Sequence, residues 1–195
     1  MRPSLRTQYA AKRTIDIVVA LSVGILLLPA SIVIAMAIRS SSEGEIIFRQ
    51  TRVGLGGQPF TIYKFRTMRP RGDRWGSGPS PARITPIGRI LRRTSLDELP
   101  QVVNVLRGDM AVVGPRPDLP QQVERYTARQ RQRLLVKPGI TGLASINGRN
   151  EIPWDERIEL DIRYVEGWNL MRDLKVIALT IPVLLTGRGT ALSAE

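Results

Sequence analysis

The longest apolar run of the chain lies near its beginning. Residues Ile17–Ile38 carry no charge over 22 positions, and Arg39 closes the run. A straight helix of this length would measure ~33 Å, enough to cross a hydrocarbon core of about 30 Å. Pro29 interrupts the run, because it removes a backbone hydrogen bond and clashes with the carbonyl group of Ile25. The pattern therefore predicts two apolar helices with a break at Pro29.

Three topologies are open for this apolar segment. It could be a kinked spanning helix, a signal peptide cleaved after Ala35–Ala37, or a re-entrant helix that enters and leaves by one face. The run is long for a signal peptide. Crossing would leave 25 of the 29 Lys and Arg residues inside and four outside, against the positive-inside tendency. We therefore favour the re-entrant form, with both ends at the cytoplasmic face.

A basic segment precedes the apolar run. Lys12, Arg13 and Asp16 lie three and four residues apart, so on a helix they share one face. We expect these side chains to pair with one another near the membrane interface.

Two β-rich runs follow the apolar segment. Glu45–Gln50 and Pro59–Arg66 are joined through a glycine-rich stretch at 54–57, which predicts a β-hairpin. Residues 40–44 form a linker before it. We therefore divide the chain into a membrane segment, 1–39, and a second domain, 40–195.

The second half of the chain is mainly helical in its pattern. Pro70–Pro86 is dense in Gly, Pro, Ser and Arg, which predicts an irregular segment. Leu119–Leu135 is polar and predicts one helix with exposed arginines, and 137–142 predicts a turn. Trp154–Val165 predicts an amphipathic helix with Ile158, Ile162 and Val165 facing inward. The arginines expected to be exposed are Arg125, Arg129, Arg131 and Arg133.

A last helix is predicted from Asn169, with apolar residues along one side. Its apolar part, Val176–Leu185, has ten residues and is too short to span a membrane. Two interpretations remain open: the helix lies in the membrane interface, or its apolar side packs in the core. The residues on that side are Leu170, Leu174, Ile177, Ile181 and Leu185.

Composition narrows the chemistry. The chain has 29 Lys and Arg against 17 Asp and Glu, a net charge of +12, which predicts anionic partners such as phosphates, acidic lipid or nucleic acid. Histidine and cysteine are absent. This excludes imidazole bases, thiolate nucleophiles and zinc sites built on His or Cys. A metal would need oxygen ligands, which points to magnesium, manganese or calcium.

An acidic pair stands in this basic sequence. Asp97 and Glu98 precede a run of apolar residues at helical spacing, so both should lie in the first turn of a helix. Ser95 with Glu98 fits a capping box, whereas Pro100 fits a helix that begins near Asp97. The helix dipole and nearby arginines should keep Asp97 ionised at neutral pH. The pair is either a nucleophile or metal site, or a helix cap in a solvated charge cluster.

Several motifs occur together in a characteristic order. In this order and spacing, the chain closely resembles the bacterial sugar transferases, the monotopic polyprenol-phosphate phosphoglycosyl transferases. The resemblance covers nearly the whole chain, from about Lys12 to Leu185. The motifs are Lys12-Arg13-x-x-Asp16, the Pro-broken apolar segment, Tyr63–Met68, Thr94–Gln101, Gly108–Met110, Val113–Pro117, Lys137–Gly142 and Asn147–Asn150.

The resemblance implies a reaction and a place for it. A phosphosugar passes from a UDP-sugar donor to polyprenol phosphate, usually undecaprenyl phosphate, and UMP is released at the cytoplasmic face of the bacterial inner membrane. It implies that Asp97 is the nucleophile, that Asp97 and Glu98 hold Mg²⁺, and that three arginines contact phosphate, namely Arg92, Arg116 and Arg149. It implies an α+β fold, with a re-entrant membrane helix and a small, mostly helical catalytic domain carrying a hairpin.

The chain departs from the resemblance in places. Leu28 precedes Pro29, where the family often has serine, so a hydroxyl-to-backbone bond is unavailable at that position. Residues 144–146 replace a glutamine that many members carry before Asn147. These differences prevent a transfer of the sugar preference from a relative.

The sequence leaves two other functions open. A membrane-tethered basic module that binds anionic lipid or nucleic acid would explain the charge, but not the acidic pair beside Arg116. Few aromatic residues are available to stack on bases, so we expect no nucleic-acid partner. An inactive scaffold subunit is a third interpretation. A homodimer is a further expectation, beside contacts with membrane lipids.

Overall fold

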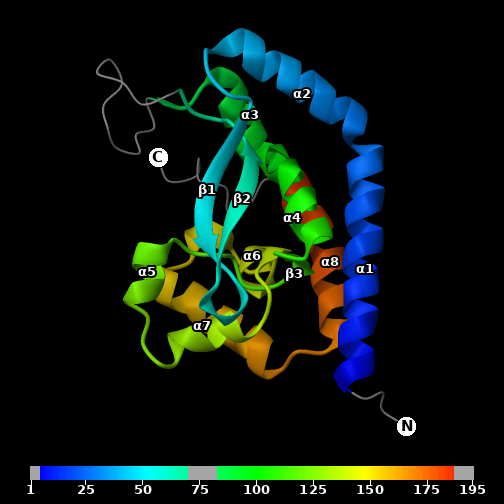
Figure 1. The fold of residues 1–195 in the computed structure, drawn as a ribbon, viewed down its shortest axis with the longest axis vertical. Coiled ribbons are helices and arrows are strands. Elements are labelled where there is room, and N and C mark those ends of the chain that lie inside the picture. Colours follow the sequence, from blue (N-terminus) through cyan, green and yellow to red (C-terminus); the bar gives the residue numbers. More distant parts are fainter. Residues whose placement is uncertain (1–4, 70–82, 187–195) are drawn as a thin grey trace.

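The structure of the protein is a computed structural model that describes residues 5–69 and 83–186. It is mostly helical (64%) and contains a short antiparallel hairpin, as expected (Figure 1). Most of the predicted irregular segment, residues 70–82, lies outside the described residues. The elements used below are α1 (Leu5–Leu26), α2 (Leu28–Ser41), β1 (Ile47–Val53), β2 (Pro59–Phe65), α3 (Pro86–Thr94), η3 (Leu96–Gln101), α4 (Val102–Arg107), β3 (Ala111–Val113), α5 (Pro120–Glu124), η4 (Gln130–Leu135), β4 (Gly139–Thr141), α6 (Leu143–Ile146), η5 (Arg149–Glu151), α7 (Trp154–Glu166) and α8 (Leu170–Thr186).

The apolar run forms two helices, as predicted. Helices α1 and α2 meet at Leu27 with a bend of 60°, and Pro29 lies in the first turn of α2, where a missing N–H costs least. Ser31 Oγ donates to the Leu27 carbonyl at 2.8 Å, so a hydroxyl supports the break from a position the sequence had not suggested. In Figure 1, α1 runs along one side and α2 turns across the top. Within residues 5–69 and 83–186, only this bent pair, and no single helix, has the length and composition to cross a membrane.

The basic face of α1 holds the helix to the rest of the molecule. Lys12 Nζ donates to Asp173 Oδ2 of α8 at 2.7 Å, and Asp16 Oδ1 accepts from the Val112 N–H at 2.9 Å. Arg13 donates to two carbonyl groups of α4. The expected pairing is confirmed for Lys12 and Asp16, whose Nζ and Oδ1 atoms form an ion pair at 4.0 Å. Arg13 and Asp16 form no recorded ion pair in the described part of the chain. Beyond this pairing, the three side chains join α1 to α8, β3 and α4.

The predicted hairpin is confirmed. Strands β1 and β2 pair antiparallel from Ile47 opposite Phe65 to Val53 opposite Pro59. The first strand extends three residues beyond the predicted end at Gln50.

The predicted turn at 137–142 is wrong, because it contains a strand. Strand β4 pairs in parallel with β3, with Ala111 opposite Gly139 and Val113 opposite Thr141. The backbone of Gly139, the first residue of β4, lies close to that of Gly114, which follows β3. A Cβ added to Gly139 would lie 2.1 Å from the Gly114 nitrogen, so only glycine fits there.

The single polar helix predicted for Leu119–Leu135 is also wrong. The segment folds as two short helices, α5 and η4. Arg125, Arg129 and Arg131 are exposed as expected, but Arg133 is buried. The next predicted helix is confirmed by α7, with Ile158 and Ile162 in the core.

Helix α8 buries only part of its surface. Val176 and Asp173 are buried, whereas Leu174, Ile181 and Leu185 on the predicted apolar side are exposed. Core packing of that side, one of the two open interpretations, is therefore wrong for these three residues.

Three apolar clusters form the core. One joins α1, β2, α4, β3, α7 and α8, and a second joins β1, α5 and α7. The third joins α2 to the end of β2 and to α3, and Leu96 and Leu99 of η3 pack against it. The third cluster therefore ties the acidic pair to the bent apolar helices. Its buried members are Ile34, Ile38, Phe65 and Leu91.

Candidate active site

The acidic pair lies where the sequence predicts it, in the first turn of η3. The predicted capping box is wrong. Ser95 adopts a left-handed backbone conformation (φ 57°), and its hydroxyl accepts a hydrogen bond from Arg149 Nη1 at 3.0 Å. The Glu98 side chain points to other partners. The turn is therefore tied to η5 by a side chain rather than closed on itself.

Glu98 is held between two cations. Lys64 Nζ of β2 donates to Glu98 Oε1 at 2.7 Å, and Arg116 Nη2 donates to the same oxygen at 2.6 Å. Glu98 is 9% exposed. Burial would raise the pKa of its carboxyl group, but Arg116 and Lys64 outweigh burial and hold that pKa well below its usual range. Glu98 is therefore a permanent anion that fixes the two cations.

Asp97 is different, although it is the next residue. Its side chain forms no recorded hydrogen bond or ion pair within residues 5–69 and 83–186. Burial and the Glu98 charge raise its pKa to about 6, against the opposing effects of Lys64, Arg116 and Arg92. The carboxyl group is therefore still mostly ionised at neutral pH, as predicted, although burial moves its pKa closer to neutrality than the arginines alone would. Asp97 is thus an anion close to cations and free of fixed partners.

The structure brings the predicted arginines to the acidic pair. Arg92 acts electrostatically on Asp97 and donates from Nε to Thr67 Oγ1 at 3.0 Å. Arg149, in η5, interacts with the charges of Glu98, Arg116 and Asp97. The cations therefore surround one small region, as a phosphate-binding site requires.

Sequence reasoning missed Lys64 as a site residue. Residues alternate between the two faces of a strand, so Lys64 and Arg66 share one face of the predicted strand Pro59–Arg66. Two cations on one face were a signal that could have identified Lys64. Lys64 reaches Glu98, whereas Arg66 donates to the carbonyl groups of Ser42 and Glu43 after α2. Burial lowers the pKa of Lys64, and Glu98 opposes this shift.

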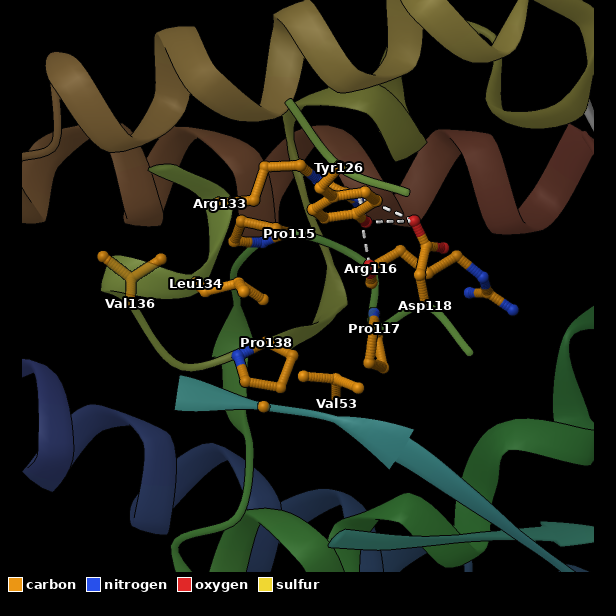
Figure 2. A pocket seen from close by; sticks show the side chains of 11 residues that line it. Val53, Pro115, Arg116, Pro117, Asp118, Tyr126, Arg133, Leu134, Val136 and Pro138 are labelled. Carbon is orange, nitrogen blue, oxygen red and sulfur yellow. Dashed lines mark hydrogen bonds and ion pairs between the residues drawn. The ribbon is translucent and has the colours of Figure 1, made fainter. Parts of the chain in front are cut away.

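Arg116 lies in a loop between β3 and α5. Figure 2 shows the cavity behind this loop, with Arg133, Tyr126 and Asp118 gathered on one side of it and Val53 and Pro138 on the other. The Arg116 guanidinium pairs with Glu98, which raises the pKa of Arg116 further above its usual range. The cation is thus always charged.

The oxygen donors present fit a magnesium ion. Magnesium is usually bound by one or two carboxylates, with water and substrate phosphates completing its octahedron. Asp97 has no competing partner among the described residues, and Glu98 would have to give up a cation to bind a metal. The described residues contain no group of three or more acidic side chains that could hold a metal without substrate.

Comparisons with known proteins identify the family. The family model described as bacterial sugar transferase matches residues 7–187. The chain belongs to this family. It is similar to the uncharacterized sugar transferase EpsL of Bacillus subtilis, with 45% identity over 182 residues, covering 91% of this chain and 89% of that protein.

Two further relatives carry a named activity. The UDP-glucose:undecaprenyl-phosphate glucose-1-phosphate transferase of Caulobacter vibrioides is 45% identical over 191 residues, which cover 90% of this chain and 70% of that protein. The Escherichia coli protein of the same name is 42% identical over 185 residues, covering 87% of this chain and 39% of that protein. The predicted family is therefore confirmed, and with it the enzyme class, phosphoglycosyl transferase.

Proposed function

We propose that this bacterial sugar transferase moves a phosphosugar from a UDP-sugar to polyprenol phosphate, with undecaprenyl phosphate as the acceptor, and releases UMP. The names of the Caulobacter and Escherichia relatives support this substrate pair. The observation that carries the proposal is the contrast within the acidic pair. Among residues 5–69 and 83–186, Asp97 has no hydrogen-bond or ion-pair partner and is mostly ionised beside cations, whereas Glu98 is held by two of them.

Asp97 is the proposed nucleophile. One of its carboxylate oxygens attacks the β-phosphorus of the donor, and the bond from that phosphorus to the bridging oxygen breaks. UMP leaves with the bonding electrons, and the phosphosugar remains on Asp97. A phosphate oxygen of the lipid then attacks the same phosphorus, which releases the carboxylate and forms the lipid diphosphate.

The surrounding cations have a matching task. Arg92, Arg116 and Arg149 are proposed to bind the donor phosphates and to stabilise the charge that develops on the transferring group. Glu98 fixes the guanidinium of Arg116 and the ammonium group of Lys64, so these cations need little reorganisation when a phosphate arrives.

Asp97 and Glu98 are proposed to hold Mg²⁺, which would neutralise charge on the donor diphosphate. Glu98→Gln should therefore raise the magnesium concentration needed for half-maximal rate. A magnesium titration identical to that of the wild type would remove Glu98 from the ligand set.

The test of the function uses the purified chain in nanodiscs with undecaprenyl phosphate and magnesium. A panel of UDP-sugars is offered, and UMP release and lipid-linked sugar are measured. We expect one or a few donors to give both products, in equal amounts, only when lipid phosphate is present. A chain that binds the vesicles but turns over none of the donors would favour the non-catalytic lipid-binding module instead.

The bent helices are proposed to form a re-entrant membrane segment, which keeps both of its ends at the cytoplasmic face of the inner membrane. The break at Leu27 and the exposed apolar residues of α1 and α2 support this topology. It would hold the acidic pair at the membrane surface, because Leu96 and Leu99 pack against the third apolar cluster, which contains residues of α2.

Cysteine labelling tests the topology, since the native chain has no cysteine. Ser4→Cys and the exposed Ser41→Cys are each treated with a membrane-impermeant thiol reagent in intact cells. Protection of both in intact cells, and labelling of both after lysis, is the expected result. Labelling of Ser4→Cys from outside would establish a spanning helix instead.

A further inference from the structure

The loop that carries Arg116 is held by its backbone carbonyl groups. Four consecutive carbonyl oxygens each accept a hydrogen bond from a different donor outside the loop. The pairs are Pro115 with Gly139 N (2.9 Å), Arg116 with Arg133 Nη2 (2.9 Å), Pro117 with Arg52 Nη1 (3.2 Å) and Asp118 with Val53 N (3.1 Å).

These external bonds matter because the loop has few donors of its own. Pro115 and Pro117 have no backbone N–H, so half of the donors that could close a turn within residues 115–118 are missing. Its conformation therefore depends on what surrounds it. The carbonyl group of Arg116 accepts its hydrogen bond from Arg133, and the guanidinium of the same residue pairs with Glu98.

Arg133 is well fixed for such a task. It is 5% exposed, and its guanidinium lies between two carboxylates, donating to Asp161 Oδ2 at 2.7 Å and to Asp118 Oδ2 at 2.7 Å. It also donates to the Tyr126 hydroxyl, which in turn donates to Asp118 Oδ2 at 2.5 Å. Figure 2 shows Arg133, Tyr126 and Asp118 together on one side of the pocket, opposite Val53 and Pro138.

No direct contact between Arg133 and the acidic pair is recorded in the described part of the chain. Its donors are all committed to Asp118, Asp161, Tyr126 and the Arg116 carbonyl group. A planar fork with several donors in fixed directions suits this set of acceptors, whereas a lysine ammonium group would reach only some of them.

We propose that Arg133 is a positioning residue for phosphoryl transfer, which sets the place of the Arg116 guanidinium by holding the Arg116 carbonyl group from behind the loop. This inference rests on the proposed function. Displacement of a substrate-positioning group by about 1 Å can cost on the order of 10²-fold in rate. Arg133→Lys should therefore reduce kcat by about that factor and change the donor KM much less.

A double-mutant cycle tests the proposal. Single and double variants of Arg133→Lys and Arg116→Lys are assayed for UMP release, with each rate divided by the folded fraction from thermal unfolding. If Arg133 acts through Arg116, its substitution should cost about 10²-fold in the wild type but no more than about threefold in the Arg116→Lys background. Arg131→Lys is the matched control, because Arg131 is exposed in the same short helix, and it should change neither kcat nor KM.

Equal losses in the two backgrounds would overturn the positioning role and leave Arg133 with a purely structural one. If Arg133→Lys does not fold, Tyr126→Phe replaces it in the cycle. This variant removes the hydroxyl that bonds both Arg133 and Asp118, and it should give a smaller loss with the same non-additivity. An inactive wild type would overturn the proposed function itself, whereas an active wild type with additive losses would overturn only this inference.

Discussion

The acidic turn and the Arg116 loop meet at one ion pair but are held in different ways. Leu96 and Leu99 of the turn pack against the apolar cluster beneath α2. The loop is instead held by hydrogen bonds to its carbonyl groups, one of them from the buried Arg133 and one from the partly buried Arg52. The proposed nucleophile is thus positioned by apolar packing, and the proposed phosphate-binding cation by a polar network.

This difference gives Glu98 a specific task. It belongs to the acidic turn, but both of its oxygens face cations of the other regions, Lys64 of the hairpin and Arg116 of the loop. Glu98 therefore joins the two regions, and each can be disturbed separately. Substitutions in the turn should affect the chemistry or the apolar packing, while those in the loop should affect phosphate binding.

The largest effect is expected at the nucleophile. Asp97→Asn keeps the size of the side chain but removes its charge, and loss of a nucleophile should lower turnover on the order of 10⁴-fold or more. UMP release with saturating donor and lipid measures it. The far-UV circular dichroism should stay that of the wild type. Turnover within tenfold of the wild type would contradict the role of Asp97.

The next largest effect is expected in the loop. Arg116→Lys keeps the charge but loses the planar fork that spans both Glu98 and a phosphate, so kcat should fall on the order of 10³-fold. The same assay, with donor concentration varied, separates kcat from KM. If lysine supports most of the activity, Arg116 supplies only a general positive charge.

A packing substitution tests the other side of the comparison. Leu91 is 1% exposed in the cluster that supports the acidic turn, so Leu91→Ala should lower the free energy of unfolding by about 2–5 kcal/mol. Its neighbour Ile90 is 58% exposed, and Ile90→Ala is the control, with little change expected. Thermal or denaturant unfolding in detergent measures both. Equal stabilities of the two variants would mean that the cluster does not support the turn.

The smallest predicted effect is that of pH. The pKa of Asp97 is raised to about 6, so the proportion of ionised nucleophile falls as the pH drops below that value. The rate of the first transfer, measured at a fixed magnesium concentration, should fall about tenfold for each pH unit below the pKa. The pKa of Asp161 is also raised to about 6, by burial against the opposing effect of Arg133, so unfolding is measured in parallel. A rate that is constant from pH 5 to pH 8 would contradict the assignment.

Sequence patterns predicted the elements that have enough length to show a period. The break in the apolar helices, the hairpin, α7 and the place of Asp97 and Glu98 in a first helical turn all followed from spacing and local residue chemistry. Strands β3 and β4 did not, because three residues are too few for an alternation and their partners are far apart in the chain. Helix α3 was not predicted, because its first residue, Pro86, closes the segment that was predicted to be irregular. Thr85 caps the helix, its hydroxyl accepting from the Gly88 N–H at 2.9 Å.

The site residues that belong to sequence motifs were predicted, whereas the properties that depend on burial in the fold were not. Arg133 was expected to be exposed because an arginine in a polar, charged segment is usually solvated. Its counter-charges Asp118 and Asp161 come from segments on either side of it, and only the fold brings them together. The ionised state of Asp97 was predicted, but the rise of its pKa was not, since the effect of burial cannot be read from neighbouring charges.

The most direct test of the account is the mass of the protein after incubation with the donor alone. With a UDP-sugar that supports turnover, and no lipid phosphate, the wild type should gain the mass of one phosphosugar on the peptide that contains Asp97. Added undecaprenyl phosphate should remove that mass, and Asp97→Asn should never acquire it. A wild type that turns over donor and lipid but carries no adduct at any time, or carries it on another residue, would contradict the central claim.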